Sequence, residues 1–384
     1  MKYWQLPQAV EEVLPEQASA MEALRRDLLD LYRSWGYELV FPPLLEYSDS
    51  LLTGLGADLD LLTFKLTDQL TGRTLGIRAD ITPQVARIDA HSYLKEGVSR
   101  LCYAGTTLHT RPKSLMASRC PVQIGAELYG DNSPEADIEI IGLMIDTLRE
   151  AGVSQMTIDI GHVGVYRAVF QALDLTDDQA LFDALQRKSA PDLSSALQGR
   201  PEADAQTIRA LMNLHGDRSV LNQARELLGD LAPNALDAID EIDVVLDALE
   251  AEGDGIDWYV DLSELRGLNY HTGLVFAAYA KGVGRALANG GRYDDIGEIF
   301  GGARAATGFA ADLKTLLAEG KALDLGLRAI SAPADRCPEL AKKIKELRSQ
   351  GDVVITALNG EHDSRCDREL VMENAWVIRP LGTA

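Results

Sequence analysis

Apolar residues at helical spacing mark the first element of the chain. They recur every three or four positions near the N-terminus, at Met21, Leu24, Leu28, Leu31 and Trp35. This spacing predicts an amphipathic helix over residues 16–34, because such positions share one helical face. Gly36 is expected to end the helix, and residues 37–41 predict a short strand. Pro42 ends that strand, since proline cannot continue a central sheet ladder.

Strand patterns dominate the next hundred residues. The apolar runs that predict strands there are residues 62–67, 74–78, 100–108, 121–129 and 155–160. Thr82 stands before a proline, so we expect it to cap a helix that runs to about residue 94. A second helix is predicted over residues 134–151. Hairpins with helices between them favour an α+β fold built on an antiparallel sheet.

The pattern changes to continuous helices between residues 175 and 255. Residues 174–257 hold 19 acidic and 6 basic side chains, which is a net charge of −13 out of −22 for the whole chain. We interpret this part as a solvated, all-helical acidic insertion.

Strands return after residue 256. The elements expected in this last part are strands over residues 258–262, 274–279 and 285–288, a helix over 307–318, a strand over 328–331, a helix over 338–349, and strands over 353–358 and 375–379. The expected domains are therefore residues 1–174 with 256–322, the helical insertion 175–255, and a short α/β domain over 323–384.

The composition is that of an ordinary globular protein. Apolar residues make up 46% of the 384 residues and charged residues 25%. The excess of negative charge argues against a nucleic-acid partner unless a local basic face exists. The four cysteines form no CxxC pair, and the six histidines show no metal-ligand spacing, so no metal site is expected. Without an apolar run of 18 residues or a signal-peptide pattern, we expect a soluble, cytoplasmic protein.

Polar residues in three places are candidates for a binding site. Asp80 and Thr82 stand where a predicted strand is followed by a predicted helix. A carboxylate there can bind a ligand ammonium group; the alternative is that it only stabilises the N-terminus of the helix. Gln123 and Glu127 share one strand face across a glycine, which leaves room between two hydrogen-bonding walls. A solvent-facing strand edge is the alternative for that pair.

The third place is the segment RGLNYHTG, residues 266–273, between two predicted strands. It combines an arginine with two ring residues, Tyr270 and His271, and two glycines. A hairpin with glycine turns explains it equally well. The glycine-rich NGGRYD, residues 289–294, leads toward the same sheet. An amino-acid ligand needs a carboxylate for its ammonium group and a cation for its carboxylate in one cleft, and these clusters together supply both.

These motifs resemble class II aminoacyl-tRNA synthetases, and histidyl-tRNA synthetase in particular. The matching stretches cover about residues 1–320: a motif 1-like helix and strand, RADIT (78–82), residues 103–130, RGLNYHTG and NGGRYDDI. The resemblance implies a class II synthetase-like antiparallel sheet flanked by helices, with the helical insertion and the short C-terminal domain added. It also implies a histidine-binding site made of Asp80, Thr82, Gln123, Glu127, Arg266, Tyr270 and His271.

The ATP half of a synthetase does not carry over. His109 stands where motif 2 has its phosphate-binding arginine, and Thr315 stands where motif 3 ends in an arginine. Neither side chain replaces a permanent bidentate cation at a phosphate. The tail of about 60 residues is also shorter than a synthetase anticodon-binding domain, and its acids and bases balance.

A histidine site without an ATP site resembles the regulatory-subunit family of ATP phosphoribosyltransferase. That resemblance implies a non-catalytic allosteric subunit of histidine biosynthesis that needs no cofactor, catalyses no aminoacylation and binds neither tRNA nor membrane. Its implied partners are L-histidine, a short-form catalytic subunit, and a second copy of itself in a homodimer core. An active synthetase-like ligase, a different small-molecule ligase and a free-standing histidine-binding module remain as alternatives. The two ligases would require the missing phosphate cations.

Overall fold

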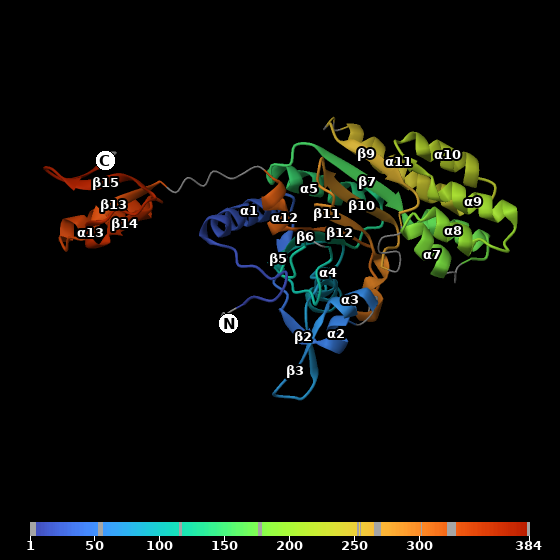
Figure 1. Ribbon diagram of the computed structural model, residues 1–384, viewed down its shortest axis with the longest axis horizontal. Helices are drawn as coiled ribbons and strands as arrows, with labels where there is room; N and C mark the ends of the chain where they lie inside the picture. Colours follow the sequence, from blue (N-terminus) through green and yellow to red (C-terminus); the bar gives the residue numbers. More distant parts are fainter. Residues whose placement is uncertain are drawn as a thin grey trace. The chain divides into compact units, whose positions relative to one another are not determined.

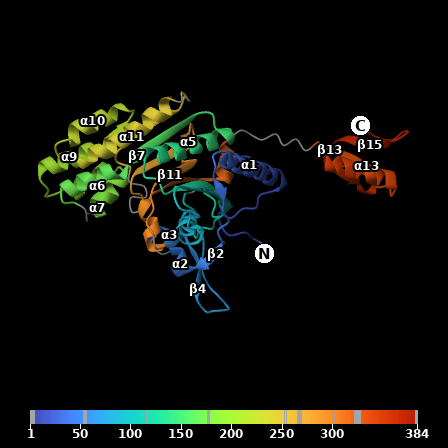
Figure 2. The same ribbon diagram turned by 180° about the vertical axis from the view of Figure 1, so that it is seen from behind.

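The computed structural model describes residues 5–52, 57–114, 117–175, 179–251, 253, 255–264, 270–300, 302–320 and 328–381. The chain divides into two compact units, Met1–Ala322 and Leu323–Ala384. In Figures 1 and 2 the first unit is a large twisted sheet with helices along one side and a group of helices at one end. Among the described residues, no helix is long and apolar enough to cross a membrane.

A nine-stranded sheet forms the centre of the first unit, with the strand order β1-β5-β6-β12-β11-β10-β7-β9-β8. The six middle strands pair antiparallel, whereas β1 is parallel to β5 and β9 is parallel to β7. The strands are β1 (Glu38–Leu39), β5 (Ser99–Thr106), β6 (Val122–Tyr129), β7 (Met156–His162), β8 (His215–Gly216), β9 (Asp257–Asp261), β10 (Leu274–Ala280), β11 (Ala288–Arg292) and β12 (Ala306–Asp312).

Helices cover one face of this sheet and form the main hydrophobic core with it. They are α1 (Pro15–Ser34), α5 (Pro134–Glu150), α6 (Val163–Ala172), α11 (Asn234–Ala251) and α12 (Leu313–Glu319). Leu28 of α1 and Ile140 of α5 are fully buried in the same cluster as Ile124 and Ile158 of the sheet. The apolar stripe read from the sequence of α1 therefore faces the core.

The opposite face of the sheet carries the candidate site residues. It is covered by α4 (Thr82–Arg87), the π-helix η1 (Ile88–Tyr93) and the 3₁₀ helix η2 (Asp294–Phe300). Tyr103 and Tyr129 of the sheet and Tyr293, which follows β11, are buried there in a second, smaller cluster with Ile81 and Val85. A three-stranded sheet lies beside this face and its hairpin projects from the unit (Figure 1): β2 (Leu45–Tyr47), β3 (Phe64–Thr67) and β4 (Thr74–Ile77), with helices α2 (Ser48–Leu52) and α3 (Ala57–Leu62).

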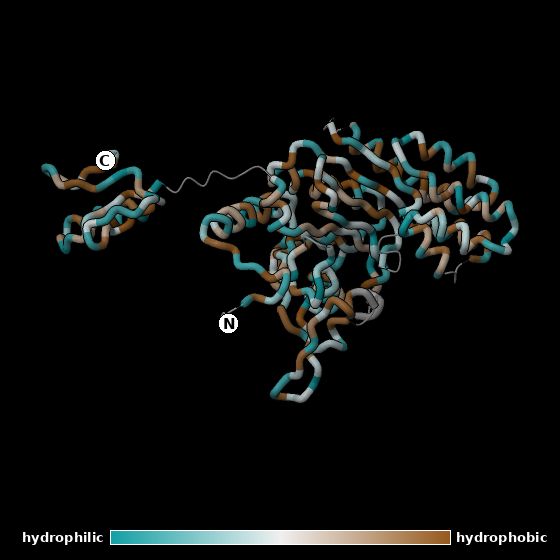
Figure 3. The backbone as a smooth tube through the Cα atoms, viewed as in Figure 1, coloured by the Kyte–Doolittle hydropathy of each residue, from teal (hydrophilic) through white to brown (hydrophobic). Residues whose placement is uncertain are grey.

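The acidic insertion is helical apart from one short strand. Its helices are α7 (Gln179–Gln186), α8 (Ala190–Ala196), α9 (Glu202–Met212) and α10 (Ser219–Leu228), followed by α11. Hydrophobic and hydrophilic residues alternate along these helices in Figure 3, which is the amphipathic pattern expected. The prediction of an all-helical insertion was wrong at His215–Gly216, because this segment pairs as β8 with β9 at the edge of the large sheet.

The second unit is a four-stranded sheet of order β14-β13-β15-β16 with one helix. Its elements are β13 (Ala329–Pro333), α13 (Pro338–Ser349), β14 (Val354–Ala357), η3 (Leu358–Gly360), β15 (Cys366–Met372) and β16 (Trp376–Pro380). Leu340 and Leu347 of α13 pack on Ile330, Val354 and Leu370 of the strands.

Three local predictions were wrong. The helix predicted over residues 307–318 is strand β12 followed by the shorter helix α12, because residues 306–312 pair on both sides with β6 and β11. The strand predicted over residues 285–288 begins only at Ala288 and continues through the glycines to Arg292. Thr82 is the first residue of α4 and not its cap; the carboxylate of Asp80 accepts the Thr82 backbone N–H instead.

Candidate functional site

Glu127 lies at the centre of the polar cluster on the face of the sheet that α4, η1 and η2 cover. It is 1% exposed, on the inward face of β6. The hydroxyl of Tyr103 donates to its Oε1 at 3.0 Å, and the hydroxyl of Tyr293 donates to its Oε2. Two tyrosines, one from β5 and one that follows β11, thus hold the carboxyl group in a fixed orientation.

Burial controls the protonation of these groups. It raises the pKa of Glu127 to about 8, because a charged carboxylate loses its hydration inside the protein, while the tyrosine and Thr82 hydrogen bonds oppose this rise only in part. Burial also raises the pKa of Tyr103 and of Tyr293 well above 10, so both hydroxyls keep their protons. Near neutral pH the carboxyl group is therefore mainly protonated, and a positive charge placed beside it would favour loss of that proton.

Asp80, Thr82 and Gln123 join Glu127 through Tyr103. The side-chain amide of Gln123 donates to Asp80 Oδ1 at 2.8 Å, and its carbonyl oxygen accepts the Ile81 N–H at 2.9 Å. The hydroxyl of Thr82 lies 3.1 Å from that of Tyr103. The start of α4 is thereby fixed against β6, and four of the residues predicted from the sequence come together in one network.

Glycines in the neighbouring strands make room for the site side chains. Gly308 lies opposite Glu127 in the register of β12 and β6, and a methyl group at Gly308 would overlap the Glu127 carboxylate. Gly291 is the next residue across the sheet, opposite Gly308. A methyl group there would come within 2.7 Å of the His271 ring. The glycine floor thus lets polar side chains lie flat on the backbone.

Tyr270 and His271, which belong to the RGLNYHTG segment, reach the same site. The Tyr270 ring stacks on that of Tyr293 at 5.1 Å between centroids, and the His271 ring meets Tyr270 edge-on at 5.3 Å. Among the described residues, the buried hydroxyl of Tyr270 has no hydrogen-bond partner. Six of the seven predicted residues therefore lie together, and the seventh, Arg266, lies outside the described residues. We call the set Asp80, Thr82, Tyr103, Gln123, Glu127, Tyr270, His271 and Tyr293 the Glu127 site.

Tyr103 and Tyr293 were missed as site residues in the sequence. A signal for Tyr103 existed, because it lies opposite Gly125 in the predicted strand pair, where a glycine leaves space for a large neighbour. Tyr293 belongs to the NGGRYD motif noted in the sequence, but nothing in that motif indicated that its partner is Glu127, 166 residues away in the chain.

Comparisons with known proteins decide the family. The histidyl-tRNA synthetase family model matches residues 9–316, and the model described as "ATP phosphoribosyltransferase subunit HisZ C-terminal domain" matches residues 327–379. The ATP phosphoribosyltransferase regulatory subunit of Thioalkalivibrio sulfidiphilus is 50% identical, with 98% of each chain covered. That of Ectopseudomonas mendocina is also 50% identical, over 99% of this chain and 98% of the relative.

The chain belongs to the ATP phosphoribosyltransferase regulatory subunit family. It is thus a regulatory subunit in histidine biosynthesis, a partner of the catalytic subunit and a non-catalytic paralogue of histidyl-tRNA synthetase. A crystal structure titled as an ATP phosphoribosyltransferase regulatory subunit/histidyl-tRNA synthetase from Bacillus halodurans has a TM-score of 0.82 and 27% identity, covering 94% of this chain and 95% of that one. These findings confirm the predicted family and fold class.

In this regulatory subunit, His109 and Thr315 both bond to the protein itself; the sequence resemblance set these two residues at the positions of phosphate-binding arginines. His109 is 3% exposed and its Nε2–H donates to the Ala79 carbonyl at 2.9 Å, while burial lowers the pKa of the ring. The Thr315 hydroxyl donates to Asp312 Oδ2 at 3.0 Å. A neutral imidazole and a hydroxyl, each bound to the protein itself, present no permanent positive charge to a nucleotide phosphate.

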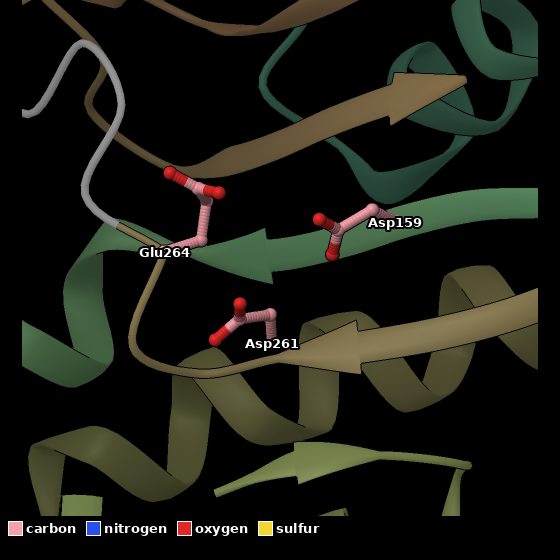
Figure 4. Close-up of side chains that lie close together, drawn as sticks. All are labelled: Asp159, Asp261 and Glu264. Atoms are coloured by element: carbon pink, nitrogen blue, oxygen red, sulfur yellow. The ribbon is translucent and has the colours of Figure 1, made fainter. Parts of the chain in front are cut away.

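Two other features of the regulatory subunit lie away from the Glu127 site. Asp159 on β7, Asp261 at the end of β9 and Glu264 bring carboxylate oxygens within 4.8 Å of one another (Figure 4). Lys188 forms an ion pair with Asp261, which also accepts hydrogen bonds from Ser263. A surface hollow of about 330 Å³ lies at the C-terminal end of α5, lined by residues 149, 152–154, 156, 255 and 256.

Proposed function

We propose that this regulatory subunit binds free L-histidine at the Glu127 site, and that this binding changes the activity of the catalytic subunit as feedback. The observation that carries the proposal is a buried carboxyl group held by two tyrosine hydroxyls and connected to Asp80 and Gln123. Such a site is small, polar and shielded from water, as recognition of one amino-acid side chain requires. The resemblance to histidyl-tRNA synthetase supports the same ligand.

Each part of histidine has a proposed counterpart. Asp80 and Thr82 take the ammonium group, Arg266 takes the carboxylate, and Glu127 faces the imidazole with Gln123, Tyr270 and His271 around it. Each Glu127 oxygen already accepts one tyrosine hydroxyl, and a carboxylate oxygen has a second lone pair for a ligand N–H. The unpartnered Tyr270 hydroxyl, next to this carboxyl group, supplies a further hydrogen bond.

Regulation follows from linkage. Histidine must bind one state of the assembly more tightly than another, and such couplings are typically about 1–3 kcal/mol. We therefore infer a reciprocal effect: the short-form catalytic subunit changes the affinity of this chain for histidine. Histidine changes the affinity between this chain and the catalytic subunit by the same factor. A free-standing histidine-binding module would lack this reciprocity.

We also propose that two copies form a homodimer through the edge of the large sheet at β1. Apolar side chains are exposed there and along the segment that leads to β2, at Leu39, Phe41, Leu44 and Leu45, and Phe41 is 76% exposed. The same residues follow the helix that resembles motif 1, where class II synthetases form their dimer interface. A single face that meets its own copy gives a closed, isologous contact.

Calorimetry on the full chain tests the binding site. Glu127→Ala leaves a ligand N–H unpaired in a buried site, which costs about 1–3 kcal/mol or roughly five- to 150-fold in affinity. Arg266→Ala is expected to cost a similar amount by unpairing the ligand carboxylate. Asp240→Ala, an exposed partner of Arg225 in the insertion, is the control and should bind like the parent. Parent-like binding by both site variants would place the site elsewhere.

Activity of the assembly tests the feedback. The purified chain is mixed with a short-form catalytic subunit, and phosphoribosyl-ATP formation is measured with and without histidine. We expect histidine to inhibit the complex with the parent chain and to lose potency with Glu127→Ala. Unchanged inhibition with Glu127→Ala would assign the feedback site to the catalytic subunit.

A further inference from the structure

The NGGRYD motif contains a buried arginine that the proposed ligand contacts do not use. Arg292 is the last residue of β11 and is 6% exposed. Its side chain runs beneath Gly273, where even a methyl group would come within 2.9 Å of it. The arginine therefore passes directly under the segment that carries Tyr270 and His271.

All five N–H donors of Arg292 are in use. Nε and one terminal nitrogen donate to Asp137 Oδ2 of α5, at 3.0 and 2.7 Å. The same terminal nitrogen donates to the Ser133 carbonyl, and the other donates to the Asp131 carbonyl and to Asp294 Oδ1. Because a lysine has three donors on one atom, only arginine can satisfy this arrangement.

Arg292 holds the end of β11 on the α5 face of the sheet, while the next residue, Tyr293, points into the Glu127 site. Successive side chains of a strand point to opposite faces, so Arg292 reaches α5 and Tyr293 reaches Glu127. Any shift of the Arg292 backbone must then move the hydroxyl that holds the Glu127 carboxyl group.

A second connection links the arginine to the other wall of the site. The Thr272 N–H donates to the Arg292 carbonyl at 2.7 Å, and the Thr272 hydroxyl donates to Asp294 Oδ2 at 2.9 Å. Asp294 in turn accepts from Arg292 and from the Ala306 N–H. Thr272 is two residues from Tyr270, so the two stacked tyrosines are anchored to one buried charge cluster.

We propose that Arg292 is a positioning residue of the ligand site. It acts through Tyr293 on one side and through Asp294 and Thr272 on the other, and so sets where the hydroxyls of Tyr293 and Tyr270 meet Glu127 and the ligand. The inference rests on the proposed histidine binding and adds to it a residue that does not touch the ligand. A purely structural arginine would affect stability and leave affinity unchanged.

Two variants and one matched control separate these roles. Arg292→Lys keeps a positive charge beside Asp137 but loses the forked contacts. Thr272→Val keeps the side-chain shape and removes only the hydroxyl link. Arg304→Lys is the control, because Arg304 also forms an ion pair with a buried carboxylate, that of Asp89, but binds the carbonyls of Lys95 and Gly97 instead of the site. Histidine affinity and thermal midpoint are measured for all of them and the parent.

We expect Arg292→Lys to weaken histidine binding at least tenfold and Thr272→Val to weaken it three- to tenfold. Arg304→Lys should bind within twofold of the parent, with a loss in thermal midpoint like that of Arg292→Lys. Parent-like affinity in Arg292→Lys, or equal weakening in the control, would overturn the proposal. If Arg292→Lys does not fold, the histidine affinity of Thr272→Val tests the proposal in its place. Parent-like affinity in Thr272→Val would then overturn the proposal. A parent chain that binds no histidine would overturn the proposed function itself, and this inference with it.

Discussion

At the scale of single residues, the chemistry of the site comes from what surrounds each side chain. Glu127 is one of 59 acidic residues in the chain, yet it is buried against tyrosine hydroxyls instead of being paired with a cation. Desolvation therefore decides its protonation. His109 shows the same principle in reverse, because burial favours its neutral form.

The raised pKa of Glu127 predicts a pH dependence of stability. Its folded pKa of about 8 lies above the ordinary value of 4.5, so the folded state holds the proton more tightly. The stabilising contribution is complete below pH about 4.5 and is lost as the pH rises toward about 8, by up to about 1.4 kcal/mol per pH unit. Glu127→Gln has no such titration. Urea unfolding at pH 5.5, 7 and 8.5 should show the variant gaining on the parent as the pH rises; a constant difference would contradict the raised pKa.

The glycine floor predicts the effect of one added methyl group. Gly308→Ala is expected to displace the Glu127 carboxyl group and to weaken histidine binding by roughly tenfold or more, as overpacking of a buried site costs about 1–3 kcal/mol. Gly284→Ala is the control, because its surroundings are open and its φ is ordinary. Calorimetry compares the two, and equal affinity for both variants would show that the floor is not part of the site.

At the scale of elements, pairing between strands overrides local preference. Residues 306–312 are rich in alanine and precede a true helix, and by themselves they favour a longer helix. In the structure they form β12, because β6 and β11 offer hydrogen bonds on both sides. Asp312 then marks the change from strand to helix.

Asp312 is predicted to stabilise this junction. One oxygen accepts the N–H groups of Lys314 and Val122, and the other accepts the hydroxyl of Thr315. Asp312→Ala should lower the free energy of unfolding by about 1–2 kcal/mol, because a helix cap and a link to β6 are lost together. Denaturant unfolding measures it. The exposed Asp240→Ala should change stability by less than about 0.5 kcal/mol, and an equal effect of both would argue against the capping role.

At the scale of the whole molecule, one face of the large sheet packs against α1, α5, α6, α11 and α12 in the main core, and the other face carries the Glu127 site. The exposed apolar residues near β1 lie at the edge of this sheet, where the proposed second copy would bury them. The proposed dimer contact and the proposed ligand site therefore belong to different parts of the same unit.

The dimer contact is tested by a charge in its proposed centre. Phe41→Glu should convert the parent dimer to a monomer at micromolar concentration, because a carboxylate would be buried without a partner. Leu358→Glu changes a similarly exposed residue, 69% exposed in the second unit, and should remain dimeric. Light scattering reports both masses. A parent that is itself monomeric would refute the proposed contact.

The replaced cations predict that the chain forms no adenylate. With the imidazole of His109 and the hydroxyl of Thr315 bound to the protein, the transition state for attack on ATP lacks its fixed positive charges. Histidine-dependent exchange between pyrophosphate and ATP should equal that of a heat-inactivated sample. Exchange clearly above that level would restore the ligase alternative.

The sequence by itself determined the elements whose signals are local. The helix spacing near Leu24 and Leu28 placed α1, and α13 has the bounds that its pattern predicted. Local spacing also indicated that Gln123 and Glu127 share a strand face, and the family motifs brought Asp80, Thr82 and the 266–273 segment into the same prediction. Periodicity suffices for the helices and the strand face because the residues concerned are neighbours in the chain, whereas the distant motifs were joined by the family resemblance.

Only the tertiary structure decided which distant residues meet. Tyr293 reaches Glu127 across 166 positions of sequence, and Arg292 reaches Asp137 across 155. The register of β6 and β12 then sets Gly308 opposite Glu127, so that a carboxyl group can lie where a side chain would otherwise stand. Local pattern carries no information about these contacts, because they exist only once the strands have paired and burial has removed water from the groups between them.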